Sequence, residues 1–206
     1  NSYGGVVASV AEKRGKVTTP TAGAEYSLGE GDFPILGPVN TGEDANNSSI
    51  VIRLNYRDTH FLFNGDAEKE EEEEILSSGQ DITADVYKVS HHGSAGANAA
   101  DYVKKVQPQW AVISCGKNNS YGHPHKEVLS LLKKQGIQVL RTDLQGSVIA
   151  YSDGSTITFS SAVETPKEEK AGKTEEEGAT YIIKEKKKKF HLPDCDSVSQ
   201  IQKNNI

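Results

Sequence analysis

Two short polar motifs, each placed directly after an apolar run, constrain the fold of this chain more than any other feature. Asn64-Gly65-Asp66 follows His60-Phe61-Leu62-Phe63, and His91-His92-Gly93-Ser94 follows a run that ends at Val89-Ser90. Such runs predict buried strands, whose ends hold side chains rigidly at the edge of a layered α/β core. Because aspartate and imidazole are common ligands of catalytic cations, the pattern predicts a metal site suited to hydrolysis.

A third motif, Asn118 to His125, follows the apolar strand that ends at Cys115. Pro124 suits the first position of a helix, which predicts that His123 is the N-cap residue of that helix. The free backbone N–H groups of a helix N-terminus favour a phosphate group. His123 is then expected to donate a hydrogen bond to the phosphate or to protonate a leaving oxygen.

Apolar periodicity predicts the order of the secondary structure. Strands are expected near residues 25–28, 33–36, 49–56, 59–63, 85–89, 110–115, 137–141, 146–151 and 155–159, and helices near 3–13, 67–78, 98–106 and 125–135. Hairpins mixed with strand-helix-strand units predict an α/β body that ends near residue 160.

Charge is divided unevenly along the 206 residues. Residues 1–160 contain 14 Lys and Arg against 20 Asp and Glu, whereas residues 161–206 contain nine of each. An acidic body argues against broad binding of a phosphate backbone through counterion release, but a metal site in it can still cleave a phosphodiester. The run from Glu70 to Glu74 is interpreted as a solvated helix face.

The composition changes after Ser160. Residues 161–180 are rich in Glu, Lys, Thr and Gly and are interpreted as a flexible charged linker, with a short segment at 181–206 beyond it. The chain contains no methionine and opens inside a predicted helix, so we interpret it as a fragment whose targeting segment would lie upstream. No apolar stretch is long enough to span a bilayer.

Six motifs in order resemble one known family. They are Asn46-Asn47-Ser48-Ser49-Ile50-Val51, Gly65-Asp66-Ala67-Glu68, Lys88-Val89-Ser90-His91-His92-Gly93-Ser94, Gly116-Lys117-Asn118, Tyr121-Gly122-His123-Pro124 and Arg141-Thr142-Asp143. Over residues 1–160 the chain resembles the metallo-β-lactamase-like hydrolase domain at the C-terminus of competence proteins of the ComEC type and in related stand-alone hydrolases. Six ordered matches make chance an implausible explanation.

The resemblance implies an αββα sandwich of mixed sheets flanked by helices, incomplete at the N-terminus. It implies a site for two divalent metal ions, zinc or manganese, with Asp66 as the bridging ligand and His92 as a further ligand. His91 would face the substrate phosphate or donate a proton, and Glu68 would orient a ligand or a water molecule. His123 would complete the catalytic set.

Substrate contacts are expected from four further residues: Asn47, Ser48, Ser94 and Tyr121. The family's main metal motif, His-x-His-x-Asp-His, is absent from the six histidines of the chain. In the family this motif precedes the region where the chain begins, which agrees with the interpretation of a fragment. Residues 181–206 resemble the start of a small metal-binding module similar to that of Ada DNA-repair proteins.

Three functions remain open. The first is a metal-dependent phosphodiesterase or nuclease of the competence type, in which a water activated by two metals attacks phosphorus and DNA is the candidate partner. The second is a phosphorylcholine-esterase-like hydrolase of small phosphoesters. The third is a catalytically inactive binding module. An extracytoplasmic or cell-surface location is expected, and the sequence predicts no oligomeric state.

Overall fold

The structure is a computed structural model that describes residues 2–13, 15, 17–40, 44–161, 182–184 and 189–191. The chain divides into two compact units, Asn1–Thr165 and Pro166–Ile206. In the second unit, β10 (Ile182–Lys184) pairs antiparallel with β11 (Lys189–His191). The predicted linker, apart from Ser161, lies outside the described residues.

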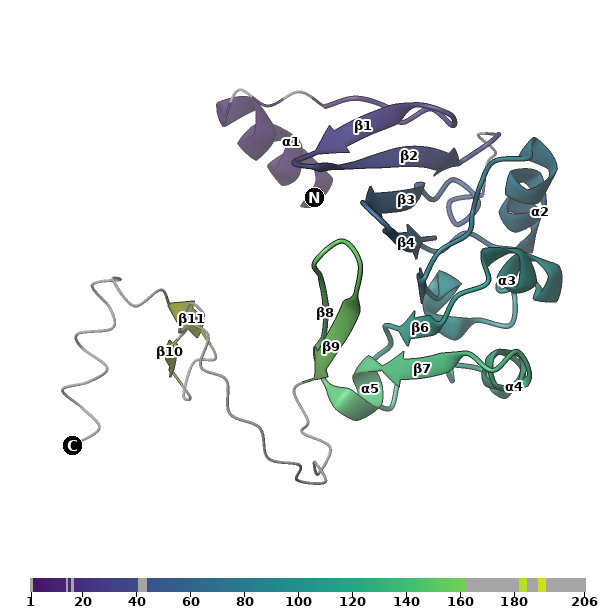
Figure 1. The fold of residues 1–206 in the computed structure, drawn as a ribbon. Helices are drawn as coiled ribbons and strands as arrows, with labels where there is room; N and C mark the ends of the chain where they lie inside the picture. Colours follow the sequence, from purple (N-terminus) through teal and green to yellow (C-terminus); the bar gives the residue numbers. More distant parts are fainter. Residues whose placement is uncertain are drawn as a thin grey trace, which may run out of the picture. The chain divides into compact units, whose positions relative to one another are not determined.

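The first unit is built on a seven-stranded mixed sheet with the strand order β1-β2-β3-β4-β5-β6-β7 (Figure 1). Its strands are β1 (Glu25–Leu28), β2 (Gly31–Gly37), β3 (Val51–Tyr56), β4 (Thr59–Phe63), β5 (Val86–Lys88), β6 (Trp110–Ile113) and β7 (Gln138–Arg141). The pairs from β1 to β4 are antiparallel, and those from β4 to β7 are parallel. Because β4, β5 and β6 are parallel, their carboxyl ends meet at one edge of the sheet, where all three motifs begin.

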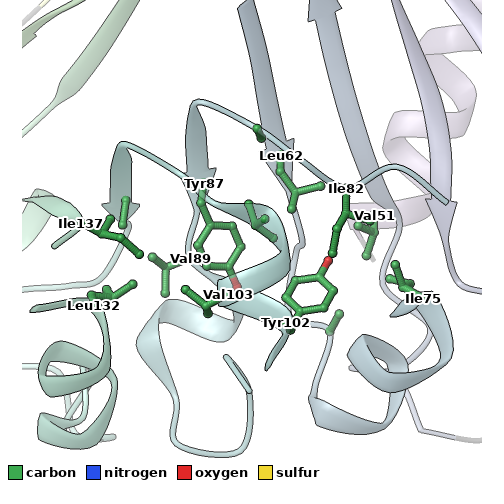
Figure 2. Packing of buried hydrophobic residues seen from close by; sticks show 14 of the residues in the cluster. Val51, Leu62, Ile75, Ile82, Tyr87, Val89, Tyr102, Val103, Leu132 and Ile137 are labelled. Carbon is green, nitrogen blue, oxygen red and sulfur yellow. The ribbon is translucent and has the colours of Figure 1, made fainter. Parts of the chain in front are cut away.

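Helices connect the parallel strands. The helical segments are α1 (Ser2–Glu12), α2 (Lys69–Ser78), the 3-10 turn η1 (Ser90–Gly93), α3 (Ala100–Val106), α4 (Lys126–Lys134) and α5 (Thr142–Gln145). Successive crossovers of one hand place α2, α3 and α4 on the same face of the sheet. Leu62 and Tyr87 from the strands pack there against Tyr102 and Val103 of α3 and Leu132 of α4 (Figure 2).

A second hairpin packs on the other face of the sheet. It consists of β8 (Val148–Ser152) and β9 (Ile157–Ser161), which form a sheet of their own. The ring centroids of Phe159 and Trp110 lie 4.8 Å apart. Since strand side chains alternate between faces, Phe61 and Lys88 point away from the helices and line a cavity of about 220 Å³ under this hairpin. The unit is therefore a mixed α/β fold in which α2, α3 and α4 cover one face of the sheet and the β8–β9 hairpin packs on the other.

Periodicity predicted every strand of this unit and the helices α1 to α4 within two residues at each end. It did not predict the turn η1 or the short helix α5. The interpretation of the Glu70–Glu74 run as a solvated face is wrong for two members, because Glu71 and Glu72 are buried. Their carboxylates accept hydrogen bonds from backbone N–H groups of neighbouring loops.

Candidate functional site

The loop after β4 places Asp66 beside the histidine turn. Gly65 has a φ of +56°, and a Cβ atom added there would lie 3.1 Å from the Cβ of Ser49, so the position favours glycine. The Gly65 carbonyl accepts a hydrogen bond from the His91 N–H at 3.0 Å. The N–H of Asp66 donates to Ser49 Oγ at 3.1 Å. The loop that carries Asp66 is thus fixed to the histidine turn by one bond and to the segment before β3 by the other.

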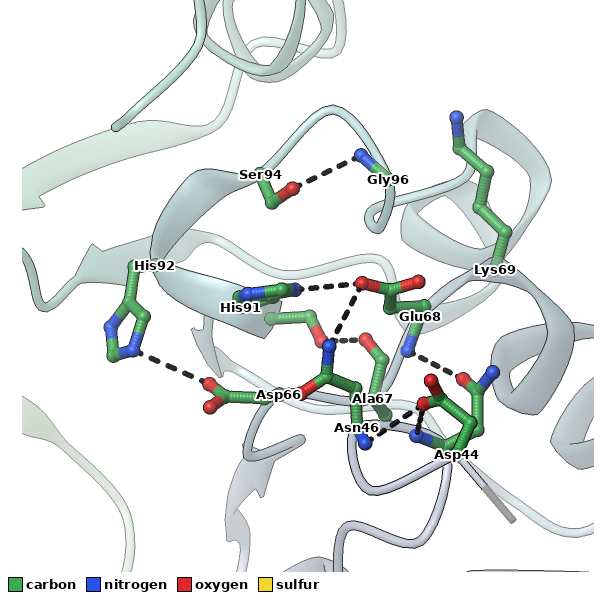
Figure 3. A network of polar contacts seen from close by, with 12 residues as sticks. Asp44, Asn46, Asp66, Ala67, Glu68, Lys69, His91, His92, Ser94 and Gly96 are labelled. Atoms are coloured by element: carbon green, nitrogen blue, oxygen red, sulfur yellow. Dashed lines mark hydrogen bonds and ion pairs between the residues drawn. The ribbon is translucent and has the colours of Figure 1, made fainter. Parts of the chain in front are cut away.

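The histidine pair lies on a left-handed turn. His91, His92 and Gly93 have φ values of +43°, +55° and +85°. Strand β5 ends at Lys88 and η1 follows, so the alternation of side chains along a strand does not apply to these two residues. The two rings nevertheless face different carboxylates, His91 towards Glu68 and His92 towards Asp66 (Figure 3).

His92 has the geometry of a metal ligand. Its Nδ1 lies 2.6 Å from the carbonyl oxygen of Ser114, which can only accept, so the ring proton is on Nδ1. The lone pair of Nε2 is then free, and Nε2 lies 3.4 Å from Asp66 Oδ1. A backbone carbonyl that fixes the imidazole tautomer in this way is the usual support of a metal-binding histidine.

His91 lies deeper in the site. Its Nδ1 is 3.1 Å from Glu68 Oε1, but the two groups lack the alignment of a hydrogen bond, so this buried nitrogen has no hydrogen-bond partner among the described residues. Glu68 Oε1 also accepts a hydrogen bond from Asn46 Nδ2 at 3.1 Å. A small rotation of the His91 ring would bring its Nδ1 into line with the carboxylate.

The Asn46-Asn47-Ser48 segment supports Glu68. Asn47 Oδ1 accepts the Glu68 N–H at 3.0 Å, and Asn47 Nδ2 donates to Glu70 Oε2 at 3.2 Å. Ser48 Oγ donates to the Asp44 carbonyl. The two predicted substrate contacts, Asn47 and Ser48, therefore already bond within the loops. Asn46 contacts the site through Glu68, although only its place in a motif pointed to it from the sequence.

The third motif brings His123 and Tyr121 to the same place. The His123 ring centroid lies 5.6 Å from that of His91 and 6.3 Å from that of His92. Tyr121 stacks on His123 at 5.7 Å and is 77% exposed. Burial lowers the pKa of His123, and the neighbouring His125, His91 and His92 lower it further. His123 is therefore a neutral imidazole near neutral pH.

A pocket opens beside these rings. Its volume is about 340 Å³, and its lining consists of His92, Ser114, Cys115, Gly116, Asn119, Tyr121 and His123. It begins at the imidazole that faces Asp66 and extends towards the exposed tyrosine. A substrate group bound there would lie next to the Asp66 and His92 pair.

The prediction that His123 is the N-cap of α4 is wrong. The helix begins at Lys126, and His125 is its N-cap because the first intrahelical bond runs from the Leu129 N–H to the His125 carbonyl. His125 Nδ1 accepts the Ala95 N–H at 2.9 Å. His125 thus joins the histidine loop to α4. Ser94, a predicted substrate contact, is nearly buried and accepts the Gly96 N–H through its Oγ.

The residues present fit one part of a metal site. Asp66 and His92 supply two converging donors, one oxygen and one nitrogen, both about half exposed. Within the described ranges, no group of three or more His, Cys, Asp or Glu residues is arranged to hold a metal ion. Two donors are fewer than the three or four protein ligands of a typical zinc site.

Comparison with known proteins gives a consistent set of relatives. The chain is 46% identical to ComE operon protein 3 of Bacillus subtilis over 129 residues, which are 62% of this chain and 17% of that protein. It is 33% identical to competence protein ComA of Neisseria gonorrhoeae over 57% of this chain and 17% of the relative. Recombination protein 2 of Haemophilus influenzae is 33% identical over 62% of this chain and 16% of the relative.

These relatives indicate a competence-related family. No family model matches the chain. The chain spans about a sixth of the length of the relatives, as the 17% and 16% coverages show. In the part of the chain that the structure describes, no helix is both long and apolar enough to cross a membrane.

Proposed function

We propose that this chain carries part of the metal site of a phosphodiester hydrolase with a metallo-β-lactamase-like αββα sandwich. The observation that supports it most is the convergence of Asp66 Oδ1 and His92 Nε2, with the His92 tautomer fixed by Ser114. Divalent cations, zinc or manganese, would supply an acidified water and neutralise the phosphate charge when bound.

The chain's own residues have separate roles in this proposal. Asp66 and His92 hold the cations. After a small rotation of its ring, His91 Nδ1 would donate a hydrogen bond to Glu68, and a proton carried on the opposite ring nitrogen would meet a phosphate oxygen or pass to the leaving group. His123 is neutral near neutral pH and therefore serves as a hydrogen-bond donor to the phosphate rather than as a cation.

We propose DNA as the substrate, because the relatives include competence protein ComA and recombination protein 2, whose names point to DNA uptake and recombination. For the same reason we propose an extracytoplasmic or cell-surface location. The acidic body makes the bound cations the main positive charge at the cleavage site. Tyr121 adds an exposed aromatic face at the pocket, on which an unpaired base can stack.

The same aromatic face supports a second candidate, a phosphorylcholine-type small phosphoester, since a quaternary ammonium group also binds to tyrosine rings. Turnover of single-stranded DNA, double-stranded DNA, bis-p-nitrophenyl phosphate and a phosphorylcholine ester, measured with added zinc or manganese, separates the two. Cleavage of none of them would favour the inactive binding module.

The assignment of the ligands is tested with His91→Ala and His92→Ala in the protein that contains this chain. His92→Ala is expected to lower the metal content in elemental analysis, because Nε2 is the donor beside Asp66. His91→Ala is expected to retain metal and to lose turnover, most strongly for DNA, whose poor leaving group needs a proton. Loss of metal in His91→Ala alone would mean that His91 is the ligand and His92 the residue that contacts the substrate. Loss of metal in neither variant would contradict a metal site at this motif.

A further inference from the structure

Asn98 is a buried polar residue that the proposed chemistry does not use. It is 4% exposed, lies between η1 and α3, and has a φ of +64°. Its amide makes four hydrogen bonds. Asn98 Oδ1 accepts from Tyr87 Oη at 2.8 Å and from the Ser90 N–H at 3.2 Å, and Nδ2 donates to the carbonyls of Ser90 at 3.1 Å and Ser94 at 3.2 Å.

These four bonds use the whole capacity of an amide, which has two donors and two acceptor lone pairs. Ser90 and Ser94 are the residues on either side of His91-His92-Gly93. One side chain therefore joins both ends of the histidine turn. Ser90 Oγ in addition donates to the Ala67 carbonyl, in the loop that carries Asp66.

The turn needs such a support. His91 and His92 both adopt left-handed conformations, which cost roughly 1 kcal/mol or more for each residue that is not glycine. A turn of this kind persists only where its surroundings determine it. Without the amide, the two histidines would be free to return to more favourable backbone angles and to turn their rings away from the carboxylates.

The support itself is anchored in the core. The N–H of Asn98 donates to Glu72 Oε1 at 2.7 Å, and Tyr87 packs in the hydrophobic core with Tyr102. Glu72 and Tyr87 are both fully buried. The histidine turn is thus connected to the interior of the fold by a continuous chain of buried hydrogen bonds.

We propose that Asn98 is a positioning residue: by holding Ser90 and Ser94 together, it aims His92 Nε2 at Asp66 before any metal or substrate binds. The importance of this orientation for catalysis rests on the proposed function. The orientation of the His92 ring does not, because it is a property of the free protein. Experiments can therefore test the orientation and the catalytic role separately.

The test measures the His92 ring in the metal-free 206-residue chain by NMR of ¹⁵N-labelled imidazoles. In the wild-type chain we expect one tautomer, with the proton on Nδ1. Asn98→Gly retains the freedom for a positive φ but removes the amide, and it should give a mixture of tautomers. Zinc affinity, measured by titration of the longer protein that contains this chain, should fall by roughly tenfold, the lower end of what the loss of a supporting hydrogen bond costs a metal site.

A matched control separates positioning from simple destabilisation. Val106→Ala removes buried methyl groups at the last residue of α3, the helix that follows Asn98, and leaves all hydrogen bonds of Asn98 in place. It should lower the free energy of unfolding and leave the His92 tautomer and zinc affinity unchanged. Unchanged values in Asn98→Gly, or equal changes in Val106→Ala, would overturn the proposal.

Tyr87→Phe covers the case in which Asn98→Gly does not fold. It removes only the hydroxyl that donates to Asn98 Oδ1 and keeps the ring in the core. A smaller shift of the tautomer in the same direction is then expected, and no shift would count against the proposal. A protein that fails to hydrolyse phosphodiesters but shows these shifts would contradict the proposed function and leave the positioning role intact.

Discussion

Two pairs of carboxylates lie close together in the sequence but differ in their exposure to solvent and in the groups they contact. Asp66 and Glu68 are 43% and 33% exposed, and they face imidazole rings. Glu71 and Glu72 are 1% and 0% exposed, and they face backbone N–H groups of distant loops. All four residues carry a carboxylate, so the surroundings decide which pair is available for chemistry.

Burial shifts the pKa of both carboxyl groups of the second pair. It raises the pKa of Glu72 to about 7, although the N–H groups of Asn98 and Ala99 oppose the shift. It also raises the pKa of Glu71, against the N–H of Val39. Glu72 connects helix α2 to the start of α3 and, through Asn98, to the histidine turn. The buried pair thus holds the loops in which the exposed pair and its histidines are placed.

The largest difference between the pairs should appear in turnover. Asp66→Ala in the metal-loaded protein that contains this chain is expected to lower turnover by on the order of 10³-fold, because it removes a group that holds the metals. The free energy of unfolding should change by no more than about 0.5 kcal/mol, since the side chain is half exposed. Steady-state kinetics and urea titration give the two values. A loss of stability with turnover retained would mean that Asp66 supports the fold and does not take part in the chemistry.

Glu72→Ala should show the opposite pattern, a loss of stability. It leaves the N–H groups of Asn98 and Ala99 without an acceptor inside the fold, which should cost roughly 3 kcal/mol in the free energy of unfolding. The exposed Glu73 in the same helix supplies the control, and Glu73→Ala should stay within about 0.5 kcal/mol. Equal losses in the two variants, in urea titrations, would mean that burial does not distinguish these residues.

The raised pKa predicts a pH dependence of stability. A carboxyl whose pKa is higher in the folded state than its ordinary 4.5 contributes stability below that value and loses it as the pH rises through about 7. From pH 4.5 to 8 the contribution should fall by up to about 3 kcal/mol. Glu72→Gln does not titrate, so the difference between the two proteins in urea titrations at each pH isolates the effect. A constant difference would contradict the shifted pKa.

The smallest effect is expected for His123, which touches neither pair through a hydrogen bond of its ring. His123→Ala should lower turnover by about tenfold to 100-fold and leave the metal content unchanged. Because the pKa of His123 is lowered, the loss should be the same at pH 7.5 and pH 9. Loss of metal in this variant would contradict the prediction and would indicate that His123 is a third ligand beside Asp66 and His92.

The sequence by itself determined the strands, the helices α1 to α4 and the edge at which the three motifs meet. These depend on local periodicity and on the rule that parallel strands align their carboxyl ends. It also placed Asp66 and His92 shortly after two strands, whose parallel pairing in the structure brings the two side chains together.

The tertiary structure alone decided which carboxylates are buried, where α4 begins and which tautomer His92 adopts. Each of these depends on a backbone group far away in the sequence: Val39 for Glu71, Ala95 for His125 and Ser114 for His92. Periodicity cannot predict such partners, because it reports which residues face the core and not which polar backbone groups the loops leave unpaired there.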